Sequence, residues 1–239
     1  MYDRCIALMY TALMLLAAPH ATAFPLNVAS AAAPSPTSPT AETLQIVVEK
    51  KLPDGTAQAM TPTHVFHTGD IIRLRLVSHF NGFLYMMDQG SSGQFSTVFP
   101  SVAAGNDNRI AEGKSYLVPA TTDGWFELTG PPGFDVFYFL LSPSVLATPA
   151  ASSFVAPGPV SSLRPRCNDA AFRARGECND ISAGPAALPR NVPLPAPLAP
   201  IAGAASRDIT IMRKDDEVTV QSGGAKTAPV IYTFRLAHN

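Results

Sequence analysis

The clearest structural signal in the sequence is Gly69-Asp70-Ile71-Ile72-Arg73-Leu74-Arg75-Leu76-Val77. Apolar Ile72, Leu74 and Leu76 alternate in it with Arg73, Arg75 and Val77. A period of two is typical of a half-buried β-strand. The dipeptide Asn81-Gly82 follows, which is a strong signal for a hairpin turn. This block therefore predicts a strand that turns at Asn81-Gly82 and pairs with a second strand at Phe83–Met87.

The turn before this strand is explained by geometry. Gly69 can supply a positive φ, and the Asp70 side chain can accept a hydrogen bond from the backbone where the turn enters the strand. We interpret Gly69, Asp70, Asn81 and Gly82 as structural turn residues.

Further short apolar runs surround this block, and no segment after residue 23 has a long helical period. The expected strands are Thr43–Lys50, Gln94–Phe99, Ser115–Val118, Trp125–Leu128, Phe134–Leu141, Asp208–Met212, Glu217–Val220 and Pro229–Leu236. Many short strands at close spacing predict a mostly β fold, either an antiparallel β-sandwich or a barrel-like domain.

The 23 prolines divide the chain. They gather with Ala, Ser and Gly in segments that lack a periodic apolar face. We predict a disordered linker at 24–42 and a single β-rich domain at 43–239, interrupted by a Pro/Ala-rich insertion at 147–206. Whether the insertion is ordered is left open.

Residues 1–23 have the pattern of a secretory signal peptide. A short apolar run from Cys5 to Ala18 ends at Pro19, and Ala21-Thr22-Ala23 fits a cleavage site. Ala29-Ser30-Ala31 is a second candidate site. An uncleaved membrane anchor is the alternative, but the run is shorter than the roughly 20 residues that span a bilayer. We expect cleavage near Ala23, no stable membrane insertion afterwards, and a periplasmic or secreted protein.

Cys167 and Cys178 are the two cysteines outside this signal. In an oxidising compartment such a pair is usually a disulfide, and residues 168–175 between them could form a short helix. Half of a metal site is the alternative, but no His lies nearby to complete it.

The charge pattern argues against nucleic acid. The net charge is −1, and the densest basic group, Arg164, Arg166, Arg173 and Arg175, is interrupted by Asp169 and Glu177. A phosphate-binding surface needs clustered Lys and Arg without such interruption.

No catalytic, cofactor or metal site is predicted. Gly113-Lys114-Ser115 resembles the end of a P-loop but lacks its upstream glycine and a following helix. His64, His67 and Asp70 lack a further ligand. The carboxylates of 215–217 are read as a solvated turn. His79 and His238 are the bases that remain for a hydrolase, and no serine motif accompanies them.

Three aromatic residues could form a binding surface instead. Tyr85, Trp125 and Tyr138 each carry a polar tip and are expected to reach the surface. A strip of such rings could hold a sugar or a peptide. Ordinary core packing is the alternative.

The middle block resembles the bacterial family known as domain of unknown function 4384, over Val65–Ser142. The resemblance is carried by Phe66, Gly69-Asp70, Gly82-Phe83-Leu84-Tyr85, Phe99-Pro100, Asn108, Gly113 with Tyr116, Pro119 and Pro131-Pro132-Gly133. Phe83 stands where the family has Tyr, and the cysteine-bearing insertion is outside the pattern. The resemblance implies a β-rich extracytoplasmic module without an established activity.

The expected function is an exported, non-catalytic binding or assembly module of the bacterial cell envelope, without a cofactor. Its partner would be another envelope protein, a peptide or a glycan, and not nucleic acid. An exported hydrolase of an unrecognised type is the alternative. The ligand and the oligomeric state are left open.

Overall fold

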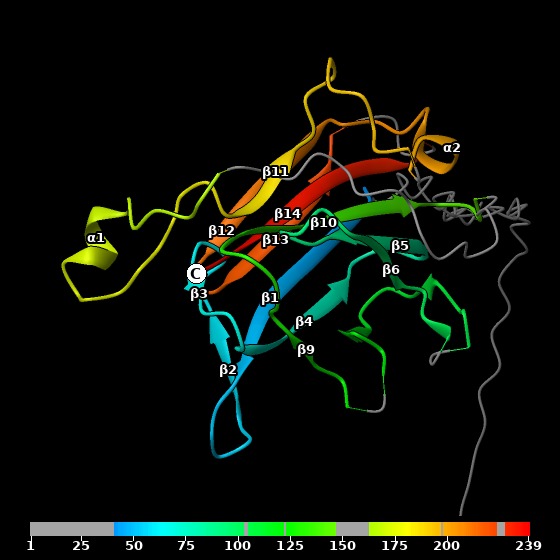
Figure 1. The fold of residues 1–239 in the computed structure, drawn as a ribbon. Coiled ribbons are helices and arrows are strands. Elements are labelled where there is room, and N and C mark those ends of the chain that lie inside the picture. Colours follow the sequence, from blue (N-terminus) through cyan, green and yellow to red (C-terminus); the bar gives the residue numbers. More distant parts are fainter. Residues whose placement is uncertain (1–40, 103–104, 122, 147–162, 197, 224–227) are drawn as a thin grey trace, which may run out of the picture. The chain divides into compact units, whose positions relative to one another are not determined.

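A computed structural model of the chain describes residues 41–102, 105–121, 123–146, 163–196, 198–223 and 228–239. The predicted signal peptide, 1–23, lies outside these residues, as do most of the predicted linker and the first part of the predicted insertion. Within them the protein is mostly β, with two sheets packed as a sandwich (Figure 1). No helix among the described residues is long and apolar enough to cross a membrane.

The first sheet is antiparallel and contains the alternating strand at Ile71–Ser78. Its main strands run in the order β12-β13-β1-β4-β8, while β2 pairs with β1 and β9 pairs with β4. Their bounds are β1 Thr43–Lys51, β2 Ala57–Met60, β4 Ile71–Ser78, β8 Ser115–Val118, β9 Phe126–Glu127, β12 Ile209–Lys214 and β13 Glu217–Ser222.

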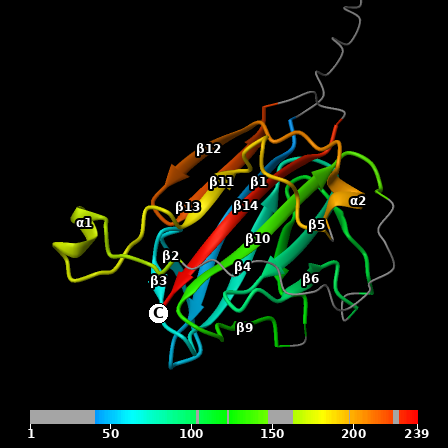
Figure 2. The same cartoon turned by 45° about the horizontal axis from the view of Figure 1, so that its top comes forward.

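The second sheet has the order β11-β14-β10-β5-β6, with β7 beside β5 and β3 parallel to β14. Its long central pair is β10 and β14, which both views show crossing the molecule side by side (Figure 2). The bounds are β3 Val65–Phe66, β5 Gly82–Gln89, β6 Phe95–Phe99, β7 Arg109–Ile110, β10 Gly133–Ser142, β11 Gly184–Ala187 and β14 Val230–His238.

The core lies between the two sheets, as the alternation predicts. Ile72, Leu74 and Leu76 are fully buried against aromatic side chains of the second sheet. Phe139 and Tyr232 stack there with ring centroids 5.1 Å apart. Burial of side chains of this size stabilises the fold by about 1.5–3 kcal/mol each, so this layer holds the sandwich together.

A second apolar cluster covers the opposite face of the second sheet. Helix α2 (Ala199–Ala202) buries Ile201 and Ala202 against Leu140 and Ile231. Figures 1 and 2 both place α2 beside this sheet. The Pro-rich segment after β11 is therefore a layer of the fold.

Strands on both sides of the predicted insertion belong to the same two sheets. β14 lies between β10 and β11, and β13 lies between β1 and β12. Part of 147–206 also enters the second sheet, because β11 pairs with β14 from Gly184 to Ala187.

The predicted hairpin at Asn81-Gly82 is wrong. β4 pairs with β1, β8 and β9, whereas β5 pairs with β10, β6 and β7, so the chain crosses from one sheet to the other here. Neither Asn81 nor Gly82 has the positive φ that a type I′ turn needs. Gly82 is required for another reason: a Cβ atom there would lie 2.5 Å from the Phe80 ring and from the Ser142 carbonyl oxygen.

Candidate functional site

The feature that stands apart from the sandwich is residues 163–182, which we call the disulfide arm. It carries α1 (Ala170–Arg173), and both views show α1 well away from the two sheets (Figures 1 and 2). The predicted Cys167–Cys178 disulfide is confirmed, with a Cα–Cα distance of 4.7 Å. The arm is thus a closed loop that projects from the domain.

Side-chain caps fix the conformation of the arm. The Asp169 carboxylate caps α1 by accepting hydrogen bonds from the backbone N–H groups of Ala171 (3.0 Å) and Phe172 (3.4 Å). The buried Asp180 carboxylate accepts from the Arg166 N–H (2.7 Å) and the Ser182 N–H (2.8 Å). Such caps satisfy backbone groups that a short helix and its flanks would otherwise leave open.

The base of the arm is anchored on the loop that precedes β3. Asn179 is fully buried, and its Nδ2 donates to Thr61 Oγ1 (2.9 Å) and Thr63 Oγ1 (3.1 Å). The Asp180 N–H donates to the Thr63 carbonyl oxygen at 2.8 Å. The arm therefore leaves the domain from a fixed base.

All four arginines of the predicted basic group are exposed on this arm. Arg175 stacks on the Phe172 ring at 4.5 Å and lies 3.8 Å from the exposed Glu177 carboxylate. Arg164, Arg166 and Arg173 form no ion pair within the described residues. A guanidinium that faces water without a partner is ready to bind a carboxylate or a phosphate.

Two of the three predicted surface aromatics are buried, contrary to expectation. Tyr85 and Tyr138 are only 4% and 8% exposed, and they belong to the cluster under α2. The Tyr85 hydroxyl accepts from the Leu146 N–H (2.7 Å) and donates to the Leu146 carbonyl (3.2 Å). The Tyr138 hydroxyl donates to Gln89 Oε1 at 3.3 Å. Their polar tips are satisfied inside the protein.

Trp125 lies in a different environment. It is half-buried just before β9, which belongs to the first sheet. The Arg73 guanidinium lies 4.3 Å from its ring centroid and the Lys51 ammonium 5.7 Å. The structure therefore does not bring Trp125 together with Tyr85 and Tyr138.

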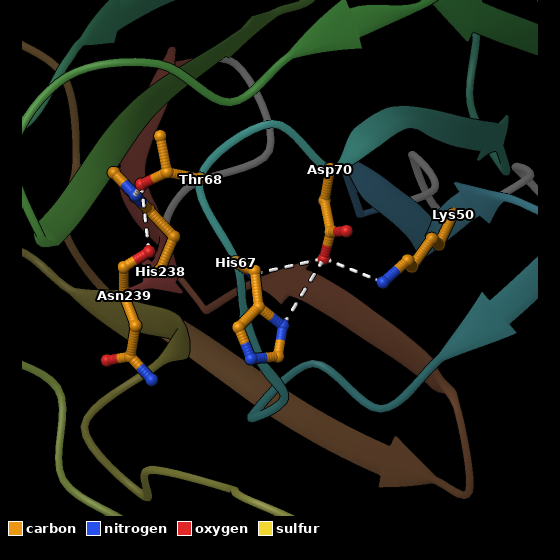
Figure 3. Close-up of polar contacts among 6 residues, drawn as sticks. All are labelled: Lys50, His67, Thr68, Asp70, His238 and Asn239. Atoms are coloured by element: carbon orange, nitrogen blue, oxygen red, sulfur yellow. Dashed lines mark hydrogen bonds and ion pairs between the residues drawn. The ribbon is translucent and has the colours of Figure 1, made fainter.

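The turn at 67–70 joins the two sheets and holds the last residues of the chain. Gly69 has a φ of +92°, and the Asp70 carboxylate accepts from the His67 N–H (3.0 Å) and pairs with Lys50 at 2.7 Å. Figure 3 shows Thr68 reaching the other way, toward His238 and Asn239. Burial raises the pKa of Asp70, but its bonds from His67 and Lys50 outweigh this and lower it overall.

No group of three or more metal-ligating side chains gathers in the part of the chain that the structure describes. His67 Nδ1 lies 4.0 Å from Asp70 Oδ2 (Figure 3), whereas His64 packs edge-on against Phe66. Asp70 Oδ2 already accepts hydrogen bonds from Lys50 Nζ and from the His67 N–H.

A buried polar cluster at the end of β14 brings together Ser91, Asp135 and His238. His238 Nε2 lies 3.2 Å from Ser91 Oγ and 3.6 Å from Asp135 Oδ1, while Nδ1 faces Thr68 Oγ1 at 3.2 Å. A hydrolytic triad needs the serine and the acid on opposite ring nitrogens. Here they share one nitrogen, and all three side chains are buried. This geometry favours a structural role.

Asp88 faces the same cluster from β5. Its Oδ1 atom is buried without a hydrogen-bond partner, although the residue as a whole keeps some exposure. Burial, and then the nearby Asp135 carboxylate, raises the pKa of Asp88 well above its usual value. The carboxylate shares its charge over both oxygens, so burial of Oδ1 without a hydrogen bond disfavours the ionised form.

The four arginines are visible in the sequence, but there their spacing only argues against nucleic acid. Asp169, which interrupts the arginines in the sequence, caps the N-terminus of α1. An Asp directly before a short Ala-rich run is a sequence signal for such a cap. The role of His238 and Ser91 had no local signal, because they are 147 positions apart.

Residues 65–144 match the model of the family described as Domain of unknown function (DUF4384), which confirms the resemblance that the sequence motifs carry. The match covers about a third of the chain, and the disulfide arm lies outside it. No curated protein and no solved structure matches the chain.

Proposed function

We propose that the mature chain is an exported, non-catalytic binding or assembly module of a bacterial cell envelope, and that the disulfide arm is its docking element. The observation that carries this proposal is a closed, capped loop with four exposed arginines, three of which form no ion pair within the described residues. The partner is an acidic segment of another envelope protein.

Export is supported by two features of the chain. The amino-terminal sequence has the charge, length and small residues of a cleavable signal. The Cys167–Cys178 disulfide fits an oxidising compartment, where such bonds persist. Together they favour the periplasm or the cell exterior.

The arm suits recognition because its backbone is already ordered before a partner binds. The disulfide and the caps of Asp169 and Asp180 restrict its backbone, so less conformational entropy is lost on binding. Arginine is enriched among the residues that dominate interface energies. Its planar fork also matches a carboxylate in two hydrogen bonds.

A photo-crosslinking experiment tests this proposal. A benzophenone amino acid is placed at Ala174, which is exposed on the arm, or at Ala57, which is exposed on β2 as the control position. Each protein is mixed with an envelope fraction, irradiated, and the joined peptide is identified by mass spectrometry. We expect a discrete product from Ala174 alone, joined to an acidic segment and lost when all four arginines are changed to Gln.

Identical products from Ala174 and Ala57, or a product insensitive to the arginine changes, would overturn the docking role of the arm. The non-catalytic reading has its own test, a screen with ester, peptide and glycoside substrates. An activity that disappears in Ser91→Ala, with unchanged thermal stability, would replace the binding module with a hydrolase.

A further inference from the structure

A second group of cations lies on the outer face of the first sheet, separate from the disulfide arm. Ile72, Leu74 and Leu76 of β4 are in the core, so Arg73 and Arg75 project to the opposite face. Glu49 of β1 lies directly opposite Arg73. The two guanidinium groups thus lie side by side on the outer face of the first sheet.

The Glu49 carboxylate holds each arginine through a hydrogen bond from its Nε atom. Arg73 Nε donates to Glu49 Oε2 at 2.6 Å, and Arg75 Nε donates to Oε1 at 2.7 Å. The terminal Nη atoms of both arginines make no hydrogen bond within the described residues. Both side chains keep solvent contact, at 22% and 37% exposure. Their outer nitrogens are oriented and unpaired.

Two further carboxylates lie on this face, Glu217 of β13 opposite Val47 and Glu127 of β9 opposite Ile71. Lys51 adds a third cation over the Trp125 ring, whereas Lys50 is paired with Asp70. The attraction for an anion therefore comes from the Nη atoms that Glu49 leaves unpaired on Arg73 and Arg75. The Nη atoms of two fixed arginines match the oxygens of a carboxylate.

The residues around the two arginines indicate what kind of anionic ligand fits this face. Leu117 of β8 lies opposite Arg75 and is 40% exposed, and Trp125 lies against Arg73. In the neighbouring row of the same face, Gln45 lies beside Thr219 of β13, and both are partly exposed. The face thus offers apolar contacts and uncharged hydrogen-bonding groups near the arginines, with Glu217 beside Thr219 in the row of Arg75. Sugars present both apolar ring faces and hydroxyl groups, which such a mixture suits.

We propose that this face binds a saccharide that carries carboxylates, with a uronic acid group held by Arg73 and Arg75. The sugar ring lies against Trp125 or Leu117, and its hydroxyls reach Gln45 and Thr219. The proposal does not depend on the disulfide arm, since the two surfaces share no residue. An acidic peptide fits this face less well, because a peptide that pairs with a sheet through its backbone does so at an edge strand.

Isothermal titration with a short oligogalacturonate tests the site. Two probes separate charge from sugar: the methyl-esterified oligomer keeps the rings without the charge, and inorganic polyphosphate keeps the charge without the rings. We expect binding of the oligogalacturonate that is roughly tenfold or more tighter than that of either probe.

The variants are chosen so that a folding defect cannot imitate loss of binding. Arg73→Gln with Arg75→Gln leaves the Glu49 carboxylate unpaired, so the triple variant with Glu49→Gln is made as well. Arg109→Gln is the matched control, because Arg109 is exposed on β7 of the other sheet. We expect both multiple variants to lose oligogalacturonate binding and Arg109→Gln to retain it, with folded circular dichroism spectra throughout.

Three results would overturn the site: no oligogalacturonate binding, equal binding by the control and the multiple variants, or polyphosphate binding as tight as that of the oligomer. Each leaves the crosslinking result at Ala174 unaffected, so the two proposals fail separately.

Discussion

Glu49 and Arg73 lie directly opposite each other on β1 and β4, and Glu49 Oε2 accepts a hydrogen bond from Arg73 Nε at 2.6 Å. Arg75 Nε donates to the second oxygen of the same carboxylate. One nearly buried acid therefore neutralises part of the charge of two arginines across the central strands of the first sheet.

Replacing Glu49 with Gln should destabilise the protein at neutral pH. Burial raises the pKa of Glu49, but hydrogen bonds from Arg75 and Arg73 outweigh it, so the pKa is lowered overall. A lowered pKa means that the stabilisation is present above the unfolded pKa and is lost as pH falls through the folded one. We expect a loss of about 1.5–3 kcal/mol at pH 7, the usual range for hydrogen bonds to charged groups.

Urea denaturation at neutral and acid pH measures this loss. The difference between wild type and Glu49→Gln should shrink as the pH falls below about 4. Glu127→Gln is the control, since Glu127 is exposed on the same sheet. A difference that stays constant from neutral to acid pH would show that the charge of Glu49 is irrelevant.

Asp88→Asn should stabilise the protein at neutral pH. The raised pKa of Asp88 comes from burial and then from Asp135. A carboxyl with a raised folded pKa favours the folded state most below its unfolded pKa, and this contribution is lost as pH rises through the folded pKa. The amide removes the charge, so its gain should be absent below about pH 4 and grow as pH rises.

Thermal melts of wild type and Asp88→Asn across this pH range show whether the substitution stabilises or destabilises the protein. Asp123→Asn, at an exposed position, should change nothing. If Asp88→Asn destabilises the protein at every pH, the Asp88 carboxylate must have a stabilising partner.

Two tyrosines with opposite surroundings give a matched comparison. The Tyr232 hydroxyl is buried in the core without a hydrogen-bond partner, whereas the Tyr85 hydroxyl makes two hydrogen bonds to Leu146. An unsatisfied buried polar group costs about 1–3 kcal/mol, and a satisfied one contributes about 1 kcal/mol per bond. Tyr232→Phe should therefore raise the free energy of unfolding, and Tyr85→Phe should lower it.

Chemical denaturation of the two variants in the same buffer decides the point. Equal losses in both would mean that Tyr232 has a partner in solution. The two changes remove the same atom from buried rings, so only its bonding differs.

The longer strands were predictable because each has an alternating or continuous apolar run, whereas the short strands β2, β3, β7 and β11 were not expected. Thr43–Lys50 and Ser115–Val118 were expected almost as they occur, since their alternation is local. The crossing at Gly82 was not predictable in the same way. Asn81-Gly82 has the composition of a hairpin, and only the contact of Gly82 with Ser142, 60 positions away, shows that the glycine is needed for close approach.

The candidate sites depend on similarly distant contacts. The Cys167–Cys178 pairing follows from the sequence because few cysteines are available. The exposure of the tyrosines does not, because the segment around Leu198 and Ile201 that covers Tyr85 and Tyr138 carries no signal of where it packs. Arg73 and Arg75 were visible as the polar face of a strand, but their shared acid, Glu49, lies on a strand 24 and 26 positions earlier.

Reduction of the disulfide should loosen the arm without unfolding the sandwich. The Cys167–Cys178 loop is short, and closing it contributes about 3 kcal/mol in the chain-entropy model. None of the buried residues between the two sheets belongs to the arm.

In the double variant Cys167→Ser with Cys178→Ser, trypsin should therefore cut after Arg173 and Arg175 first, and much faster than in the oxidised wild type. Mass spectrometry of timed digests identifies the cuts. Local opening confined to the arm predicts that the protected fragments retain β1 to β10 and β11 to β14, held together as a folded complex. Simultaneous cleavage throughout the chain would instead mean that the disulfide supports the whole domain.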